Sequence, residues 1–481
     1  MPPVSVARVL DRALAAGPDR EALVTRGHRV SYAELDRLAD RAAQALRDLG
    51  IGRGDRVAAS LPNELDVVVA FHGAMRLGAV WVGINRALAP PEQQFLLADS
   101  GSSLLLCEDD QPDLGVRICG LDDWHQALEA AADGPPGVPI DPLAPAGIAY
   151  TSGTTGHPKG AVHSQVGLLT PGAVLVESRG YGPDLRKGDC LPLTILNMMV
   201  LTTLLVAQAE GCCIVMDRID AEGVAEWIRA ERVTTWNGPP ALLHSLATND
   251  AVAASDLASL DEVWTGGADC PEGIRTMFEE RFGLPVLATY GLTEAPTVVA
   301  IDPRGGPHVE GSSGQPLPHL AVCIDDSGEI CVGAADDRYP LMLGYWQQPA
   351  ATAEALAGGV LHTGDIGFLD AAGNLHVRDR KSLVILRGGA NVYPAEVERV
   401  LQSAAGVAAS GVLGVPDERL GERVVAVVEG RPGAVLDVDA LRAHCLAHLA
   451  RYKVPERFVL VDTLPRNAMG KIVRKDLPGL V

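Results

Sequence analysis

Residues 150–160 read YTSGTTGHPKG, a stretch in which hydroxyls and glycines crowd between two apolar segments. Glycines let backbone amides approach phosphate oxygens closely, hydroxyls add hydrogen-bond donors, and Lys159 supplies a positive charge. This composition predicts a polyphosphate-binding loop, although an ordinary surface turn can have the same residues. No Gly-Lys-Ser/Thr sequence closes the loop at the spacing of a Walker A motif, so a P-loop is not predicted.

Helical and strand patterns alternate on the amino-terminal side of this loop. Ser31 and Glu34 form a capping box that begins an amphipathic helix, and Gly50 ends it. Apolar runs bounded by turn residues predict strands at 56–61, 79–84 and 103–107, and helices at 64–77 and from Pro91 onward. Alternation of this kind predicts an α/β fold in which helices cover parallel sheets.

The bulk composition limits the class of protein. With 481 residues, of which 47% are hydrophobic, the chain is long enough for two or three hydrophobic cores. A formal net charge of −21 repels nucleic acid and anionic membrane surfaces, so neither is expected as a partner. The nine cysteines contain no CxxC pair, and nothing at the amino terminus resembles a signal peptide, so we expect a cytoplasmic protein.

One nearly apolar segment, residues 191–207, approaches the length of a membrane span. It contains Pro192, Asn197 and three threonines, and the only basic residues nearby are Arg186 and Lys187. These features favour a buried helix in a large core over a transmembrane helix. We therefore expect no membrane span.

The carboxy-terminal part of the chain has a different pattern. A Pro/Gly-rich connector occupies residues 134–145, and short strands with tight turns predominate from Gly358 onward. The last elements that the pattern predicts are a helix from Pro394, strands near 409–415 and 423–429, and a helix at 439–450. We expect a large amino-terminal domain of α/β subdomains with a β-rich part over residues 1–380, and a small α/β domain over residues 381–481.

Seven further motifs follow the loop in order along the chain. They are TGGADCP at 265–271, YGLTEAP at 290–296, GEICVG at 328–333, LGYWQQPAAT at 343–352, HTGDIGFLD at 362–370, DRKSLVILRGGANVYPAEVE at 379–398 and PRNAMGK at 465–471. Together with the loop, this set resembles the signature of the adenylate-forming superfamily of acyl- and aryl-CoA synthetases, luciferases and peptide-synthetase adenylation domains. Chance production of the whole ordered series is negligible.

The resemblance implies a reaction in two half-steps. ATP and Mg²⁺ activate a carboxylic acid to an acyl-adenylate with release of pyrophosphate, and the acyl group then passes to a thiol, that of coenzyme A. A stand-alone adenylation enzyme is the alternative, which would load the phosphopantetheine of an acyl carrier protein or act on another nucleophile or oxyanion. A non-catalytic nucleotide-binding scaffold is the remaining alternative, and the intact family residues disfavour it.

Several motif residues match family positions that bind ATP. Thr293 matches the threonine at the α-phosphate, and Glu294 with Thr151 matches the oxygen ligands of Mg²⁺. Asp365 resembles the carboxylate that accepts both ribose hydroxyls, and Arg380 matches an arginine near the same sugar. The other positions assigned to ATP are Ser152, Gly153, Thr154, Thr155, Gly156 and Lys159 at the phosphates, Gly266, Gly267, Ala268 and Tyr290 at the adenine, and Gly291 in the same motif as Tyr290.

Lys471 in PRNAMGK resembles the family lysine of the first half-reaction. A carboxylate that attacks the α-phosphorus brings two anions together, and a positioned ammonium offsets their repulsion. The second half-reaction implies a rotation of a mobile carboxy-terminal domain, which withdraws the lysine and brings in a glycine-rich loop with room for pantetheine. The residues concerned are Gly388, Gly389 and Ala390 in that loop and Ser382 at the hinge, where relatives usually have Asp or Lys.

The expected acid pocket departs from the common family pattern. Many relatives place an aromatic residue and then a histidine where this chain has Thr194 and Ile195. Leu196 takes the place of the aspartate that pairs with an α-amino group, so an amino acid substrate is not expected. The other pocket candidates are Asn197, Trp236, Asn237 and Gly238, although core packing explains Trp236 equally well. An apolar or weakly polar acid of small to medium size fits this set, and its identity stays open.

Overall fold

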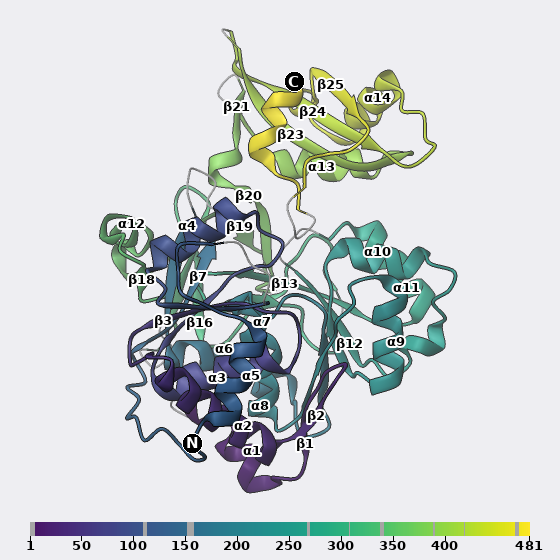
Figure 1. Ribbon diagram of the computed structural model, residues 1–481. Coiled ribbons are helices and arrows are strands. Elements are labelled where there is room, and N and C mark those ends of the chain that lie inside the picture. The colour runs from purple at the N-terminus through teal and green to yellow at the C-terminus, as the bar shows by residue number, and fades with distance from the viewer. Residues whose placement is uncertain are drawn as a thin grey trace.

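The computed structural model describes residues 5–108, 113–151, 158–266, 270–306, 308–336, 341–387, 390–417, 419–466 and 471–481, except for the side chains of Ser382 and Asn391. The chain forms a large amino-terminal domain with a smaller carboxy-terminal domain above it (Figure 1). Helices cover sheets that are largely parallel in the large domain, which confirms the predicted α/β fold class.

The loop predicted to bind phosphate belongs to a seven-stranded sheet with the order β18-β8-β7-β4-β3-β5-β6. Its strands are β3 (Arg56–Ser60), β4 (Val80–Gly83), β5 (Leu104–Cys107), β6 (Ile118–Cys119), β7 (Pro145–Thr151), β8 (Lys159–Ser164) and β18 (Gly344–Tyr345). Strand β3 pairs in parallel with β4 and β5, as the alternation predicts. Helix α2 (Tyr32–Asp48) precedes β3, and the helices between the following strands are α3 (Leu65–Leu77), α4 (Pro90–Ser100) and α5 (Leu121–Ala130). Ser31 caps α2 by accepting a hydrogen bond of 3.2 Å from the Glu34 N–H, which confirms the predicted helix start.

A second sheet of nine strands has the order β15-β14-β13-β12-β11-β9-β10-β1-β2. Its strands are β1 (Glu21–Val24), β2 (Arg29–Ser31), β9 (Arg186–Asp189), β10 (Cys212–Val215), β11 (Thr235–Asn237), β12 (Glu262–Gly266), β13 (Val286–Leu292), β14 (Thr297–Ile301) and β15 (Gln315–Pro316). The strands from β1 through β10, β9, β11 and β12 to β13 run parallel to one another. Helices α9 (Ala221–Glu231), α10 (Pro240–Thr248) and α11 (Glu272–Phe282), with the short η3 (Ala254–Leu257), lie at the right of this sheet in Figure 1.

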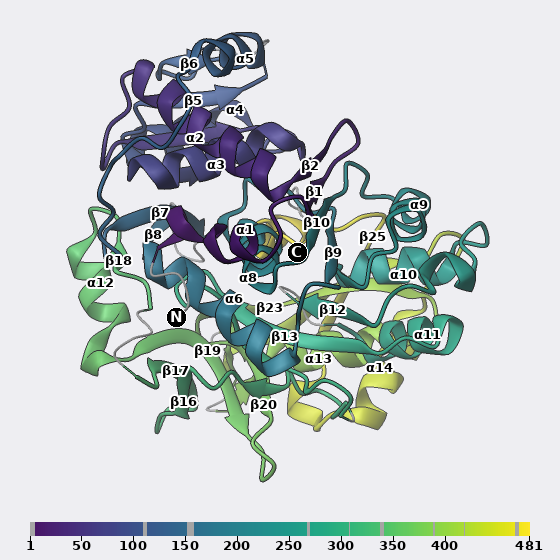
Figure 2. The ribbon, with the colours of Figure 1, turned by 90° about the horizontal axis from the view of Figure 1, so that it is seen from below.

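Helices between the two sheets complete the large domain. Figure 2 shows α1, α6 and α8 between the strands of the first sheet and those of the second. The elements of this layer are η1 (Val6–Arg8), α1 (Asp11–Ala16), α6 (Gln165–Arg179), α7 (Leu196–Met199), η2 (Val200–Leu204) and α8 (Leu205–Ala209). One hydrophobic core contains Leu23 of β1, Trp81 of β4, Leu168 of α6 and Leu287 of β13, so the two sheets share a single core.

The apolar segment at 191–207 is buried as predicted, but it does not form one continuous helix. Helix begins only at Leu196, since Pro192 lies in a turn that precedes it. The five residues of η2 form a π-helix between α7 and α8, a local widening that is frequent at functional sites. Within the described part of the chain, none of the helices has the length and apolarity that a membrane span requires.

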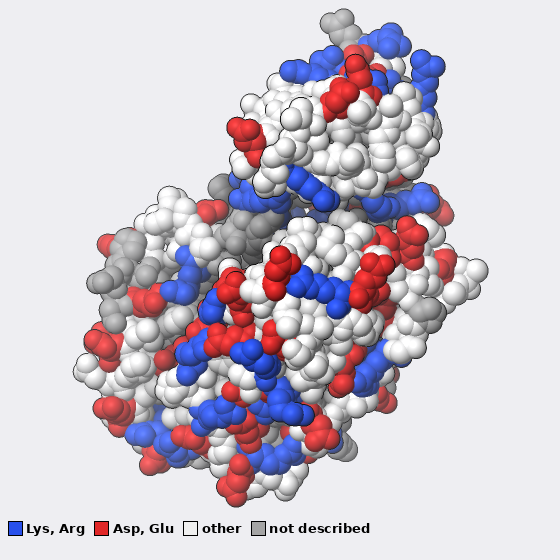
Figure 3. Space-filling model, turned by 90° about the vertical axis from the view of Figure 1, so that its right-hand side faces the viewer, with Lys and Arg blue, Asp and Glu red and all other residues white. Residues whose placement is uncertain are grey.

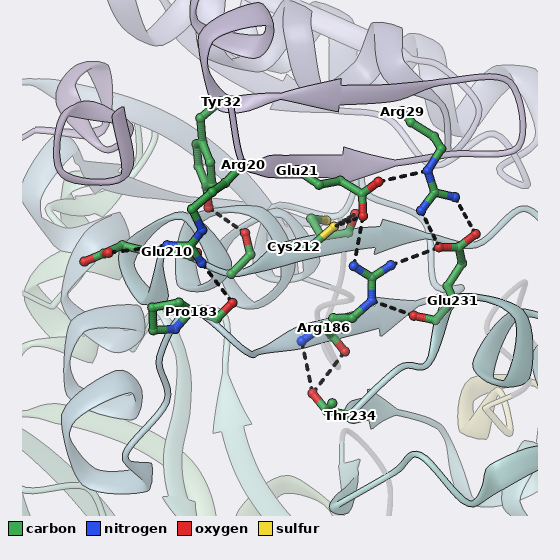
Figure 4. Close-up of polar contacts among 12 residues, drawn as sticks. Arg20, Glu21, Arg29, Tyr32, Pro183, Arg186, Glu210, Cys212, Glu231 and Thr234 are labelled. Carbon is green, nitrogen blue, oxygen red and sulfur yellow. Dashed lines mark hydrogen bonds and ion pairs between the residues drawn. The ribbon is translucent and has the colours of Figure 1, made fainter. Parts of the chain in front are cut away.

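A ring of charges holds the β1–β2 hairpin on the edge of the second sheet (Figure 4). Arg29 contacts Glu21 at 2.8 Å and Glu231 at 2.7 Å, and Arg186 contacts both of these carboxylates at 2.9 Å. Tyr32 donates a hydrogen bond of 2.7 Å to the Gly211 carbonyl in the same region. The start of the chain is therefore tied to strands nearly two hundred residues away.

Two further sheets follow along the chain, one before the junction of the two domains and one after it. The first is antiparallel and consists of β16 (Leu320–Ile324), β17 (Glu329–Ala334), β19 (Leu361–Leu369) and β20 (Leu375–Arg380), near α12 (Pro349–Ala355) and η4 (Ala357–Gly359). The second belongs to the small domain and consists of β21 (Ile385–Arg387), β22 (Ala390–Val392), β23 (Val407–Asp417), β24 (Gly421–Gly430) and β25 (Arg457–Val461). The short η5 (Lys381–Leu383) connects them.

The small domain has its own hydrophobic core, as expected for a separate folding unit. Val397 of α13, Val424 of β24 and Leu441 of α14 are among its buried residues. The helices of this domain are α13 (Pro394–Gln402), α14 (Val438–His448), η6 (Arg451–Lys453) and η7 (Arg474–Leu480). The predicted helix from Pro394, the two strands and the helix near 439–450 are all confirmed, whereas the boundary after residue 380 stays a prediction.

Gly73 allows α2 and α3 to pack in direct contact. A β-carbon at Gly73 would lie 2.6 Å from Ala42 Cβ and 2.8 Å from its backbone carbon. We expect Gly73→Ala to destabilise the large domain by about 1–3 kcal/mol, because the helices would have to separate. Gly273→Ala in α11 is the matched control: it meets no atom within 4 Å and should stabilise by about 0.4–1 kcal/mol. Urea unfolding followed by circular dichroism measures both, and equal midpoints would contradict the packing described.

Candidate active site

The two ends of the glycine-rich loop lie side by side at the end of the β7–β8 hairpin. Thr151 and Lys159 are register partners, so the hairpin brings the hydroxyl-bearing end of the loop next to its lysine. The residues predicted from sequence that lie outside the described residues are Ser152, Gly153, Thr154, Thr155, Gly156, Gly267, Ala268, Gly388 and Gly389. Of the positions assigned to adenine, Gly266 ends β12 and Tyr290 lies in the neighbouring strand β13.

Tyr345 joins Lys159 to Glu294. The Lys159 ammonium lies 5.0 Å from the centre of the Tyr345 ring, and the Tyr345 hydroxyl donates a hydrogen bond of 2.8 Å to Glu294 Oε1. Burial raises the pKa of Tyr345, and the Glu294 charge raises it further, so the hydroxyl stays protonated as a donor. One aromatic side chain thus places a cation and a carboxylate beside the loop. Tyr345 lies in the motif at residues 343–352, but no pattern in the sequence indicated its role.

A tight turn between β13 and β14 carries Thr293 and Glu294. A β-carbon at Gly291 would lie 1.7 Å from the Thr297 carbonyl oxygen, so only glycine fits there. Thr297 has φ 72°, a conformation that is strained for a β-branched residue and is typical of functional turns. The strain and the close backbone contact together define the position from which Glu294 reaches Tyr345.

Asp365 is held between two partners from different strands. Its Oδ2 accepts a hydrogen bond of 2.6 Å from the Tyr290 hydroxyl, and its Oδ1 lies 2.9 Å from Arg380 Nε. Burial raises the pKa of Asp365, whereas the Arg380 charge and the Tyr290 hydrogen bond act in the opposite direction. Asp365 and Arg380 are register partners on β19 and β20. The structure therefore brings together three residues that the sequence assigned to the nucleoside.

Lys471 of the small domain reaches the same region. An antiparallel β-bridge pairs Arg466 with Ile472, the residue that follows Lys471. Lys471 is still open to solvent, yet surrounding protein atoms partly desolvate its ammonium, and this desolvation together with the Arg380 charge lowers its pKa. Figure 3 shows the two domains meeting at a narrow waist where Lys and Arg side chains gather.

Backbone contacts determine the shape of the segment predicted to bind the acid. A β-carbon at Gly83 would lie only 1.5 Å from the Thr194 carbonyl oxygen, so this segment rests directly on strand β4. Asn63 accepts a hydrogen bond of 2.9 Å from the Leu193 N–H and donates one of 2.9 Å to the Leu191 carbonyl. Neither Asn63 nor Gly83 was singled out from the sequence, although a lone glycine in a strand pattern is a signal of close backbone approach.

The predicted pocket residues differ in burial. Leu196 is buried against Gly147 of β7, and Ile195 and Asn197 are half-buried beside it. Thr194 is buried, and its hydroxyl has no hydrogen-bond partner among the described atoms. Trp236 is fully buried in a core cluster and lies 2.1 Å from the place of a β-carbon on Gly238, as core packing of this tryptophan requires. Asn237, at the end of β11, is half-buried.

A small carboxy-terminal domain brings Lys471 close enough to Arg380 of the large α/β domain for the two charges to interact, which is consistent with an adenylate-forming enzyme. The chain belongs to the AMP-binding enzyme family. Residues 10–346 match the model of the AMP-binding enzyme family, and residues 396–471 match that of the AMP-binding enzyme C-terminal domain. These matches confirm the resemblance inferred from the motifs.

Individual relatives agree with this assignment. The long-chain-fatty-acid–CoA ligase FadD13 of Mycobacterium tuberculosis (strain ATCC 25618 / H37Rv) is 34% identical over 473 residues, which cover 93% of this chain and 92% of the relative. The feruloyl-CoA synthase of an Amycolatopsis species is 36% identical over 475 residues, which cover 94% of each chain. The chain is accordingly an enzyme of the AMP-forming acid–thiol ligase type, as the sequence predicts.

Solved structures show the same fold over the whole chain. The ATP-bound crystal structure of MatB from Rhodopseudomonas palustris is 28% identical and has a TM-score of 0.90, with 98% of each chain covered. The apo crystal structure of the same protein has the same identity and coverage but a TM-score of 0.80. The present structure is thus more similar to the ATP-bound form of that relative than to its apo form.

Gly83 provides a test of the proposed acid pocket. We expect Gly83→Ala to displace the Thr194 carbonyl and to lower kcat/KM for the acid by about a hundredfold, because small misplacements of a binding wall are costly. The measurement is acid-dependent pyrophosphate release at limiting acid. Gly182→Ala is the control, since a β-carbon there meets no atom within 4 Å. Wild-type kcat/KM in Gly83→Ala would place the pocket elsewhere.

Proposed function

We propose that this enzyme uses ATP to convert an apolar carboxylic acid into an acyl-adenylate and then transfers the acyl group to coenzyme A. The observation that carries the proposal is the convergence of Lys471 from the small domain with Arg380 and Asp365 of the large domain. This arrangement supports a role for the Lys471 charge near the residues that we assign to the ribose.

In the first half-reaction, an oxygen of the acid attacks the α-phosphorus of ATP, and the bond between this phosphorus and the pyrophosphate oxygen breaks. Lys471 offsets the repulsion between the attacking carboxylate and the phosphate. We assign the outer phosphates to Lys159 and the glycine-rich loop, and the α-phosphate to Thr293. Asp365 accepts the ribose hydroxyls while Arg380 lies near the same sugar, and the Tyr290 ring borders the adenine.

Thr151 and Glu294 have the donor chemistry that Mg²⁺ prefers, a hydroxyl oxygen and a carboxylate oxygen. Tyr345 already orients Glu294 through one of its two oxygens, which leaves the other for a metal. When bound there, Mg²⁺ neutralises part of the phosphate charge. Glu294 and Thr151 would thus act by positioning a cation against the phosphates, without taking a proton.

In the second half-reaction, the thiol attacks the acyl carbonyl and AMP leaves. We propose that the small domain rotates about Ser382, with the domain boundary after residue 380, and brings Ala390 and the neighbouring loop to the adenylate. The greater similarity to the ATP-bound form of MatB supports an adenylation arrangement in the present structure. Asp379 Oδ2 accepts a hydrogen bond of 2.6 Å from the Ala395 N–H, a contact across the boundary that the rotation must break.

The acid is proposed to be apolar or weakly polar. Leu196 and Ile195 contribute apolar surface, Asn197 adds one amide, and no carboxylate occupies the position that would pair with an amino group. The names of the two relatives, a long-chain-fatty-acid–CoA ligase and a feruloyl-CoA synthase, support an acid with a large apolar part.

Pyrophosphate release across a panel of fatty, aromatic, dicarboxylic and amino acids tests the proposal. With ATP and Mg²⁺, we expect release with fatty or aromatic acids and multiple turnovers only when coenzyme A is present. Turnover that is indifferent to coenzyme A but follows an added carrier protein would assign the acceptor to that protein. Release with no acid of the panel would contradict the proposed substrate class.

The charge of Lys471 predicts a specific pH dependence. Adenylation needs the protonated ammonium, so its rate should fall as pH rises through the Lys471 pKa, which lies below the usual value of 10.5. Lys471→Ala should lower the rate by about two to three orders of magnitude and remove this alkaline limb. Lys475→Ala, which changes an exposed lysine four residues away, is the control. Stopped-flow pyrophosphate release measures the profile, and an unchanged rate in Lys471→Ala would contradict the role of Lys471 in adenylation.

A further inference from the structure

Three side chains lie in one row across the antiparallel sheet of β16, β17 and β19. Cys323 of β16 is the register partner of Cys331 of β17, and Cys331 is in turn the partner of His362 of β19. Side chains of directly opposed residues have their β-carbons about 5 Å apart. The row therefore juxtaposes two thiols and an imidazole, and none of them has a role in the proposed reaction.

Two donor atoms of this row, those of Cys331 and His362, and a neighbouring carboxylate are close enough to share one ion. One oxygen of Asp325, Cys331 Sγ and His362 Nδ1 all lie within 4.8 Å of one another. The sulfur and nitrogen are 3.6 Å apart. Two ligands that bind one Zn²⁺ ion tetrahedrally, at about 2.3 Å for sulfur and 2.0 Å for nitrogen, stand roughly 3.5 Å apart. The observed separation fits a shared metal, although a thiol–imidazole hydrogen bond has a similar length.

Hydrogen bonds hold Asp325 in place beside the row. Its Oδ1 accepts from the Ser327 N–H at 2.8 Å, from the Ser327 hydroxyl at 2.7 Å and from the Glu329 N–H at 2.9 Å. These bonds converge on one oxygen of the carboxylate, so Oδ2 is the oxygen that a metal would take. A ligand that is already oriented loses little conformational entropy when an ion binds.

We propose that Asp325, Cys331 and His362 form a binding site for Zn²⁺, with Cys323 as the fourth ligand. Cys323 is exposed, so its side chain can rotate toward Cys331 without disturbing a core. Binding exchanges the two thiol protons, which leave to solvent, for bonds from thiolate sulfur to the metal. Thiolate, imidazole and carboxylate are the ligands that proteins use for Zn²⁺, and four of them give a closed structural site.

The site lies beside the junction of the two domains. Glu329 Oε2 is 3.7 Å from His362 Nδ1 and 2.9 Å from Lys381 Nζ, and Lys381 immediately precedes Ser382. A bound ion would place a second positive charge near Lys381. The Glu329 carboxylate would then lie close to both positive charges. If the rotation in the proposed function is correct, the charge of the metal would affect the contacts beside the hinge. Metal binding itself does not depend on that reaction.

Cobalt(II) titration of the full-length protein tests the site without any measurement of activity. The protein is reduced with a phosphine, treated with a chelator and titrated with Co²⁺, whose thiolate complexes absorb in the near ultraviolet. We expect one Co²⁺ per chain, with a thiolate charge-transfer band and the visible bands of a tetrahedral ion, both abolished by added Zn²⁺. Absence of the thiolate band in folded, fully reduced protein would overturn the proposal.

Variants locate the ligands. Cys331→Ser should abolish the charge-transfer band, His362→Gln should weaken Co²⁺ affinity by about tenfold or more, and the exposed Cys323→Ser should reduce the band. The controls are Cys445→Ala and His376→Gln, a cysteine and a histidine outside the row, which should keep it. Circular dichroism verifies folding, and the Cys323→Ser variant keeps the test decisive if Cys331→Ser does not fold. A band that survives in both cysteine variants, or the loss of two thiols to a mild oxidant without any Co²⁺ binding, would overturn the metal site.

Discussion

The buried carboxylate of Asp365 is the group on which the geometry of the active site depends. A buried charge is costly unless it is paired and hydrogen-bonded, so Asp365 requires its contacts with Tyr290 and Arg380. Through these contacts Asp365 of β19 links Tyr290 of the nine-stranded sheet to Arg380 of β20. Arg380 also acts on Lys471 through its charge, so the same carboxylate lies at the centre of the link between the two domains. The residues that we assign to the nucleoside and the lysine that we assign to adenylation are thus parts of one electrostatic arrangement.

Polar contacts occur at the domain junction among the residues that the structure describes. The Asp379 carboxylate accepts a hydrogen bond from the Ala395 N–H, and Lys381 pairs with Glu329, so the proposed rotation has to replace such contacts. The small domain keeps its own hydrophobic core, so its rotation would expose little apolar surface. A hinge with these properties needs backbone freedom more than a particular side chain, which is consistent with Ser382 in place of the more usual Asp or Lys. The proposed Zn²⁺ site lies beside this junction, so a bound ion would add a positive charge there.

Backbone contacts, more than side-chain chemistry, shape the segment that we propose for the acid pocket. The Thr194 carbonyl rests on Gly83, Leu196 packs on Gly147, and Asn63 hydrogen-bonds the segment between them. Protein interiors are close-packed, so such contacts leave few ways for the segment to move. The shape of the proposed pocket therefore depends on glycines of the first sheet as well as on the residues proposed to touch the acid.

Local sequence patterns determined much of this protein by themselves. The cap at Ser31, the strand and helix alternation and the small terminal domain follow from short-range periodicity, and the ordered motifs identified the family because a reacting site constrains residue types strongly. Only the tertiary structure decided the partners across sheets and domains. Tyr345 between Lys159 and Glu294, Asn63 beneath the pocket segment, and the row of Cys323, Cys331 and His362 join residues far apart in the chain. Strand register and core packing bring them together, and no local pattern encodes either one.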